Sequence, residues 1–273
     1  MISIISNPND LITLGFYKAF KTIYTDVSLI TYISQYKQMK DSKIIIINKF
    51  NNIMNIIYDK NKKYIILKRN EKIEKIFKEL KINYYIIYEY DDDFSYDNFI
   101  QKEKFMYIMD KIIIMPYFSI YTKNEILFNY KHNIVRNIVE KENFNKKNDI
   151  IMIKNDHHEE RKKYKLPKLK IFNCLSSIQQ KRLITDHNLF ISFSKPNNFD
   201  CKSISYMSLG SLSITNSLLN KKYIFNSIHI DEFKNNIKNF NYNSKQNLIM
   251  NIQEIYNDYT FEKYVKILDK ILK

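Results

Sequence analysis

Residues 186–215 read DHNLFISFSKPNNFDCKSISYMSLGSLSIT, and this stretch decides the predicted fold. The apolar run at 189–194 predicts a buried strand, because strands covered on both faces are nearly continuous in apolar residues. A polar loop follows, and the helical spacing at 203–209 ends at Gly210, a residue typical of the position just after a helix. A second strand is predicted at 211–215. This order of elements predicts a βαβ unit of a parallel sheet.

The same alternation of apolar runs and helical spacing extends in both directions along the chain. It favours an α/β fold with helices on both faces of parallel sheets. The predicted strands lie at 2–6, 27–32, 43–48, 63–68, 84–88, 111–115, 149–153, 169–173, 189–194, 211–215 and 222–225. The predicted helices lie at 11–24, 70–80, 176–186, 203–209, 231–240, 244–256 and 261–272.

The polar stretch at 140–148, EKENFNKKN, interrupts this alternation, which restarts at Asp149. We read the stretch as a linker between two doubly wound, Rossmann-like parallel-sheet domains. Such domains bind ligands at the carboxyl ends of their strands, so the two are expected to face each other across a cleft.

The composition excludes several classes of protein. The 273 residues include 48 Ile, 40 Lys and 33 Asn, the pattern of an A+T-rich gene, yet 45% are hydrophobic, as in a globular protein. Two glycines are too few for a P-loop or a dinucleotide-binding turn, and two cysteines are too few for a disulfide framework or a Cys-rich zinc site. No apolar run reaches the length of a membrane span. We expect a cytoplasmic protein, or one of the host cytoplasm if the chain is viral.

The net charge of +15 favours polyanionic partners such as nucleic acid or phosphorylated ligands. Drift of the gene towards A+T is the alternative cause, because 40 of the 44 cations are Lys. The four arginines, retained against that drift, are the more informative cations.

The segment at 186–215 resembles the donor-binding region of GT-B glycosyltransferases. In that family a Glu-Gly-Phe-Gly loop follows the strand, and the next helix ends in Glu-Ala-Met-Ala-x-Gly. Here the loop reads Asn197-Asn198-Phe199-Asp200, and the helix end reads SYMSLG at 205–210. The resemblance implies that the nucleotide-sugar donor contacts Ser194 at the strand end, Asn197, Asn198, Phe199, Asp200 and Ser205.

Further segments extend the resemblance over most of the chain. Residues 133–144 resemble the interdomain segment, 176–186 resemble the helix before the donor-domain strand, and 258–262 resemble the turn that opens the last helix. The resemblance implies an N-terminal acceptor-side domain at 1–141 and a nucleotide-sugar-binding domain at 149–258. A helix at 259–273 would return to the first domain, in a version of the fold of minimal size.

This sequence departs from the family at its two acidic positions, which fall on Asn197 and Ser205. Ser205 can accept a hydrogen bond from a ribose hydroxyl but carries no charge. The change weakens donor binding by roughly 1.5–3 kcal/mol, unless the nearby Asp200 substitutes. A catalytically silent protein is therefore a real alternative.

A cationic segment at 154–170, KNDHHEERKKYKLPKLK, follows the strand at 149–153. Cationic side chains and helix amides bind phosphates at such places. The resemblance implies that Arg161 holds the donor diphosphate, with Lys162 or Lys163 in support; a solvated basic helix face is the alternative. The pair His157-His158 does not predict a metal site, since adjacent residues of a helix do not face one way. We expect no cofactor and no obligatory metal.

An acidic segment at 81–97, KINYYIIYEYDDDFSYD, follows a predicted aromatic strand. A carboxylate at the strand's carboxyl end can deprotonate an acceptor hydroxyl as a general base. We choose Glu89, with Asp91 as second choice; a solvated acidic loop is the alternative. The segment resembles one in phage DNA β-glucosyltransferases, which are also GT-B enzymes, where a Phe-Ser pair follows the base as Phe94-Ser95 follows Glu89 here.

The leading prediction is therefore a glycosyltransferase, a hexosyltransferase, that moves a sugar from a nucleotide diphosphate sugar to a hydroxyl of a glycan or similar acceptor. One alternative is a glucosyltransferase acting on hydroxylated bases of DNA, which suits the net charge. Another is a catalytically silent GT-B-like module that binds nucleic acid or glycan.

Overall fold

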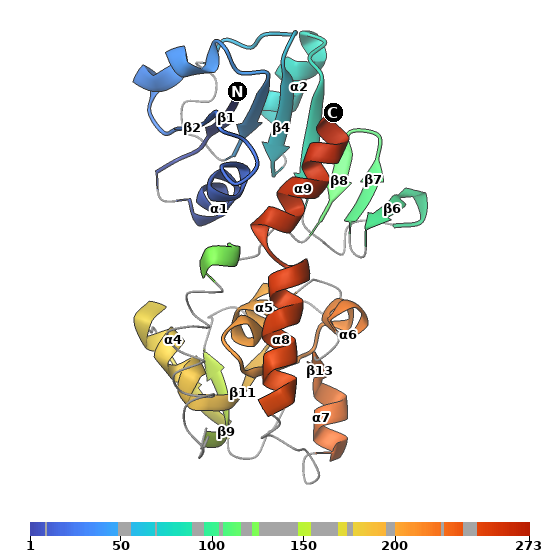
Figure 1. The fold of residues 1–273 in the computed structure, drawn as a ribbon. Helices are drawn as coiled ribbons and strands as arrows, with labels where there is room; N and C mark the ends of the chain where they lie inside the picture. The colour runs from blue at the N-terminus through green and yellow to red at the C-terminus, as the bar shows by residue number, and fades with distance from the viewer. Residues whose placement is uncertain are drawn as a thin grey trace. The chain divides into compact units, whose positions relative to one another are not determined.

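The computed structural model describes residues 1–8, 10–48, 56–68, 70–88, 96–103, 106–115, 122–125, 147–153, 169–173, 177–194, 200–224, 227–236 and 245–273. The described chain is α/β and contains two separate, mainly parallel sheets (Figure 1). Contacts divide it into two compact units. The first comprises Met1–Thr122 and Phe261–Lys273, and the second comprises Lys123–Thr260.

The first sheet has eight strands in the order β2-β1-β3-β4-β5-β8-β7-β6. The bounds are β1 Ile2–Ile5, β2 Val27–Ile30, β3 Ile44–Ile47, β4 Lys63–Leu67, β5 Tyr84–Tyr88, β6 Ile100–Glu103, β7 Met106–Met109 and β8 Ile112–Ile114. The strands β1 to β5 and β8 are parallel, whereas β6–β7 and β7–β8 pair antiparallel.

The expectation of a purely parallel sheet is thus wrong at this edge. Only Asp110 and Lys111 separate β7 from β8, and a parallel connection needs a crossover of a dozen or more residues. Asp110 has a φ of 46°, which suits a tight hairpin turn.

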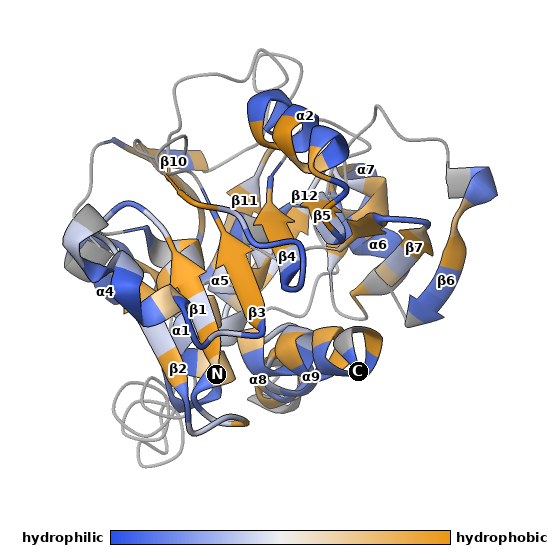
Figure 2. Cartoon of the chain, turned by 90° about the horizontal axis from the view of Figure 1, so that it is seen from above, coloured by the Kyte–Doolittle hydropathy of each residue, from blue (hydrophilic) through white to orange (hydrophobic). Residues whose placement is uncertain are grey.

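Helices cover both faces of the first sheet, with α2 (Glu71–Glu79) on one side and α1 (Leu11–Phe20) and α9 (Phe261–Leu272) on the other (Figure 2). The described residues of this unit also form the 3₁₀ helices η1 (Ile33–Met39) and η3 (Tyr96–Asn98). The Asn70 side chain accepts a hydrogen bond from the Ile73 amide at 3.2 Å and thereby begins α2.

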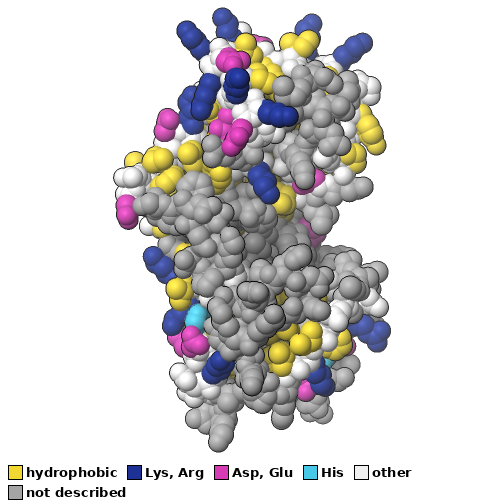
Figure 3. Space-filling view, turned by 180° about the vertical axis from the view of Figure 1, so that it is seen from behind, with side chains coloured by type: hydrophobic (Ala, Val, Ile, Leu, Met, Phe, Trp, Pro, Cys, Tyr) yellow, Lys and Arg dark blue, Asp and Glu magenta, His cyan; other side chains and the backbone are white. Residues whose placement is uncertain are grey.

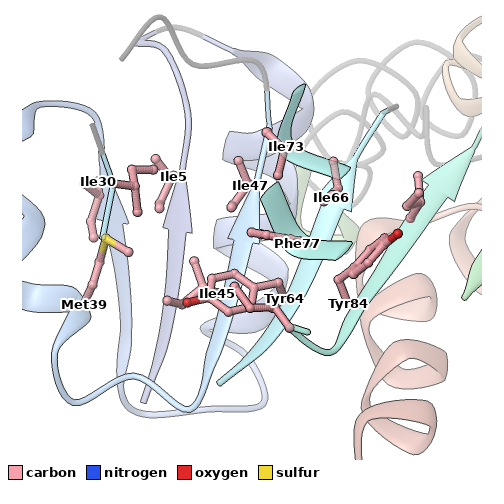
Figure 4. Packing of buried hydrophobic residues seen from close by; sticks show 13 residues of the cluster. Ile5, Ile30, Met39, Ile45, Ile47, Tyr64, Ile66, Ile73, Phe77 and Tyr84 are labelled. Carbon is pink, nitrogen blue, oxygen red and sulfur yellow. The ribbon is translucent and has the colours of Figure 1, made fainter. Parts of the chain in front are cut away.

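The core on the α2 face consists of alternate residues of the strands (Figure 4). Ile5, Ile45 and Ile47 pack there with Tyr64 of β4 and with Phe77 of α2, whose ring centroid lies 4.8 Å from that of Tyr64. The aliphatic run 44–47 therefore places isoleucines on both faces of the sheet, as its lack of polar residues predicts.

On the opposite face, α9 packs against α1. The rings of Phe16 and Phe261 meet edge to face with centroids 5.1 Å apart, and the Tyr24 hydroxyl donates a hydrogen bond to Asp269. Gly15 permits this contact, because a Cβ at Gly15 would lie 2.2 Å from Cε2 of Phe261.

The second sheet has five parallel strands in the order β10-β9-β11-β12-β13. The strands are β9 Lys147–Ile153, β10 Leu169–Phe172, β11 His187–Ser192, β12 Leu212–Thr215 and β13 Ile228–His229. The helices described over their whole length are α4 Ser177–Asp186, α5 Cys201–Ser208, α6 Leu218–Tyr223, α7 Ile230–Asn236 and α8 Lys245–Asp258. One core cluster lies between the sheet and α7, and another lies between the sheet, α4 and α5.

The predicted strand at 222–225 is wrong. Residues 218–223 form α6, and its first turn is capped by Ser217, whose hydroxyl accepts a hydrogen bond from the Asn220 amide at 3.1 Å. This local capping outweighs the β propensity of Tyr223 and Ile224. The strand that pairs with β12 follows later, as β13.

Both sheets share one strand order. The order is β2-β1-β3-β4-β5 in the first sheet and β10-β9-β11-β12-β13 in the second, so the second strand of each set lies at one edge beside the first. The third, fourth and fifth strands follow in order on the opposite side of the first strand. This is a common doubly wound order, and its switch point lies between the first and third strands. The switch points are therefore β1/β3 and β9/β11, where ligands of such sheets bind at the carboxyl ends.

Candidate functional site

The switch point of the second sheet is where two predicted segments begin. The neighbouring parallel strands β9 and β11 end at Ile153 and Ser192. The cationic segment follows β9, and the loop predicted from the resemblance to bind the donor (the donor loop, 195–200) follows β11. The chain thus leaves the sheet at adjacent points before both segments, although residues 154–168 and 195–199 lie outside the described residues.

Asp200 is the centre of a polar network beside these strand ends. Its side chain is buried, and Oδ1 accepts hydrogen bonds from the Ser192 hydroxyl and the Lys202 amide, both at 3.1 Å. Oδ2 accepts from the hydroxyls of Ser203 at 2.7 Å and Thr215 at 2.9 Å. Four donors occupy the carboxylate's approximately four acceptor positions. Asp200 therefore ties β11, β12 and α5 together and fixes the end of the donor loop.

Two asparagines extend this network. The amide N–H of Asp200 donates to Asn220 Oδ1 at 2.7 Å, and Asn220 Nδ2 donates back to the Asp200 carbonyl at 3.0 Å. Asn216 makes a matching pair with the backbone of Ser194, at 2.9 Å and 2.7 Å. The two side chains thereby hold both described ends of the donor loop, Ser194 and Asp200.

The predicted donor-binding serines differ in their surroundings. Ser194 is half-buried, and its backbone is held by Asn216. Ser205 lies in α5 with 8% of its surface exposed, and its Oγ has no hydrogen-bond partner. A buried hydroxyl without a partner costs about 1–3 kcal/mol. The Ser205 hydroxyl therefore has unused hydrogen-bonding capacity, which the ribose contact expected from the resemblance would require.

Tyr206, which the sequence analysis did not select, lies in the same helix. Burial raises the pKa of its phenol, and the charge of Asp200 raises it further. Its ring packs against Phe190 of β11 with centroids 4.8 Å apart. Tyr206 therefore keeps its proton and contributes apolar packing under the network.

The remaining predicted residues lie outside the described part of the chain. They are Glu89, Asp91, Arg161, Lys162, Asn197, Asn198 and Phe199. Strand β5 ends at Tyr88, so Glu89 directly follows the carboxyl end of a strand, as the predicted general base requires.

A second polar cluster, not selected from the sequence, lies at the switch point of the first sheet. Asp10 caps α1: its Oδ1 accepts from the Thr13 amide at 2.8 Å, and its Oδ2 accepts from Asn48 Nδ2 at 3.0 Å. Asn48 Nδ2 also donates to the Thr13 hydroxyl at 2.8 Å. Ser6 follows β1 and is buried, with an Oγ that has no partner. Asn48, a polar residue directly after the buried strand β3, was the sequence signal that could have pointed to this cluster. The signal is hard to recognise because the chain contains 33 asparagines.

Among the described residues no group of three or more His, Cys, Asp or Glu side chains has the arrangement of a metal site. None of the described helices combines the length and apolar character needed to cross a membrane.

Comparison with known proteins gives no matching family model, no matching curated protein and no matching solved structure.

Proposed function

We propose that this chain is a glycosyltransferase that transfers a sugar from a nucleotide diphosphate sugar to a hydroxyl of a glycan or similar acceptor. The observation that carries the proposal is the adjacency of β9 and β11 at a switch point. Doubly wound sheets bind ligands at such points. Here the strands lead into a segment rich in cations and a polar loop, which suits a diphosphate and a nucleoside respectively.

In this proposal the donor is held by residues that follow the two strands. Arg161, supported by Lys162, binds the diphosphate through charge-assisted hydrogen bonds. Asn197, Asn198 and Phe199 form the loop around the nucleotide, and Ser194 and Ser205 offer hydroxyls. Asp200 acts as a positioning residue, because its four hydrogen bonds fix the loop's end.

The proposed chemistry is an inverting displacement. Glu89, with Asp91 as second choice, accepts the proton of the acceptor hydroxyl. The hydroxyl oxygen forms a bond to the anomeric carbon as the bond from that carbon to the diphosphate oxygen breaks. The diphosphate leaves with both bonding electrons, and its negative charge is stabilised by Arg161 and backbone amides. The GT-B-like arrangement of the two domains is part of this proposal.

The net charge of +15 favours a second acceptor class, hydroxylated bases in DNA. Figure 3 shows Lys and Arg interspersed with Asp and Glu over the described part of one face. Transfer to a hydroxylated DNA duplex, with no transfer to glycans, would select this candidate.

A thermal-shift screen of nucleotide diphosphates and sugar nucleotides tests the proposal. A ligand at about 100 times its Kd stabilises the protein by about 2.7 kcal/mol, so a bound donor raises the melting temperature measurably. Slow hydrolysis of the bound sugar nucleotide without acceptor would distinguish an enzyme from a silent binding module.

Calorimetric titration of two variants tests the diphosphate contact. Arg161→Ala should weaken nucleotide binding by roughly 1.5–3 kcal/mol, whereas Lys168→Ala, the matched control from the same segment, should change it little. Equal effects would show that Arg161 is a solvated cation like its neighbours.

A further inference from the structure

The cluster at the first switch point contains a buried hydroxyl without a partner. Ser6 is 1% exposed, and its Oγ has no hydrogen bond. The amide of Ser6 pairs with Ile30 of β2, and the amide of Asn48 pairs with Ile5 of β1, so both residues continue their strands. Because Ile5 and Ile47 point into the α2-face core, Ser6 and Asn48 lie on the opposite face, which α1 covers.

Ser6 and Asn48 are also neighbours across the strands. The register pairs Ile5 with Ile47, so the next residues, Ser6 and Asn48, stand side by side. Asn48 reaches Asp10 and Thr13 in the first turn of α1. Ser6, with its unpartnered hydroxyl, therefore shares one face of the sheet with the polar group at the start of α1.

The hydrogen-bonding capacity of this group selects the class of ligand. Asp10 is half-buried, and each of its carboxylate oxygens accepts one hydrogen bond, from Thr13 and from Asn48. A carboxylate oxygen can accept about two, so each retains acceptor capacity. The carboxylate's charge repels an anion at the start of α1, and Asp10 belongs to no group of three or more His, Cys, Asp or Glu side chains arranged for a metal among the described residues. Neutral hydroxyl groups match the free acceptors.

We infer that the carboxyl end of β1 and β3 binds the hydroxyl groups of a neutral sugar through Asp10, Asn48 and Ser6. Asp10 accepts hydrogen bonds from sugar hydroxyls, and the Ser6 hydroxyl gains its missing partner. The inference rests on the proposed transferase function for the ligand's role, that of the acceptor sugar.

Saturation-transfer NMR with methyl glycosides of glucose, galactose and N-acetylglucosamine tests this site on the full chain. We expect at least one glycoside to bind the wild type. Asp10→Asn preserves a good helix cap but removes the charged acceptor, so it should weaken that binding about tenfold or more. Ser6→Ala should weaken binding without lowering the melting temperature, because it removes a hydroxyl that is unpaired in the free protein.

Ser213→Ala is the matched control, because Ser213 in β12 is also fully buried with an unpartnered Oγ. It should leave glycoside binding unchanged. Absence of glycoside binding by the wild type, or equal binding in all three variants and the wild type, would overturn the inference. A lower melting temperature in Ser6→Ala with unchanged binding would assign Ser6 to the fold and overturn it too.

The nucleotide screen is read in parallel on the same protein. Nucleotide binding without glycoside binding refutes this sugar site and leaves the transferase proposal standing. Glycoside binding that depends on Asp10 and Ser6, without nucleotide binding, supports the site and refutes the transferase.

Discussion

Gly15→Ala tests the packing of α9 against α1, because the substitution should lower the free energy of unfolding here, whereas it raises that free energy in an exposed helix. In an exposed helix the substitution stabilises by about 1 kcal/mol, because Gly is the poorer helix former. Here the new Cβ would lie 2.2 Å, 2.5 Å and 2.5 Å from three ring carbons of Phe261. Phe261 is itself buried and packed against Phe16, so the ring has little room to move.

Overpacking of this kind costs typically 1–3 kcal/mol, and the short distances place this case near the upper end. After the helix-propensity gain is subtracted, we expect a net loss of about 2 kcal/mol of unfolding free energy. Urea unfolding followed by circular dichroism measures this loss, and the melting temperature should fall by several degrees.

Phe261→Leu should relieve the clash, so the double variant should lose less stability than the two single changes added together. A stabilised Gly15→Ala variant, or strictly additive effects, would show that Phe261 does not pack on Gly15 and would refute the assignment of α9 to the first unit.

Three further predictions concern the network and the chemistry. Asp200→Ala should lower the free energy of unfolding in urea by about 3 kcal/mol or more, because it leaves several buried donors unpaired. Asp200→Asn keeps the helix cap and should lose less stability. A loss below about 1 kcal/mol for Asp200→Ala would contradict the network's role. Because the pKa of Tyr206 is raised above its ordinary value of 10.0, its stabilising contribution is complete below pH 10 and is lost as the pH rises further. Tyr206→Phe should therefore show a shallower fall of melting temperature above that pH, and an unchanged slope would argue against it. Glu89→Gln should lower turnover about 10²–10⁴-fold with donor affinity nearly unchanged, and full activity in both Glu89→Gln and Asp91→Asn would show that this acidic segment is not catalytic.

Strands and helices with strong local signals were predictable from the sequence. The run at 44–47 is a strand because four consecutive isoleucines can be buried on both faces, and Asn70 starts a helix by its cap. The polar strand β6, with the sequence IQKE, has no such signal, and its pairing depends on the hairpin that joins it to β7. The antiparallel edge of the first sheet therefore depends on the pairing of β6 and β7 with each other and of β7 with β8, which the local sequence does not signal.

The candidate site was predictable only in part. Asp200 stood out as the carboxylate nearest the donor loop. Its carboxylate fills its hydrogen-bond acceptor positions partly with the hydroxyls of Ser192 and Thr215, which come from two different strands. Asn216 and Asn220 looked like compositional asparagines, although they hold the described ends of that loop. Contacts between residues distant in sequence give these side chains their roles, and local pattern does not encode them.

The first unit is built from two separated stretches of chain, because residues 261–273 join residues 1–122. During synthesis on the ribosome, domains fold as their residues emerge. All residues of the second unit leave the ribosome before α9, so that unit can finish folding while α1 still lacks its partner helix. Until α9 is made, Phe16 lacks its contact with Phe261, so a ring that is buried in the folded protein stays exposed and can bind chaperones. Completion of the first unit thus waits for the synthesis of residues 261–273, and any function that requires both units begins only after that.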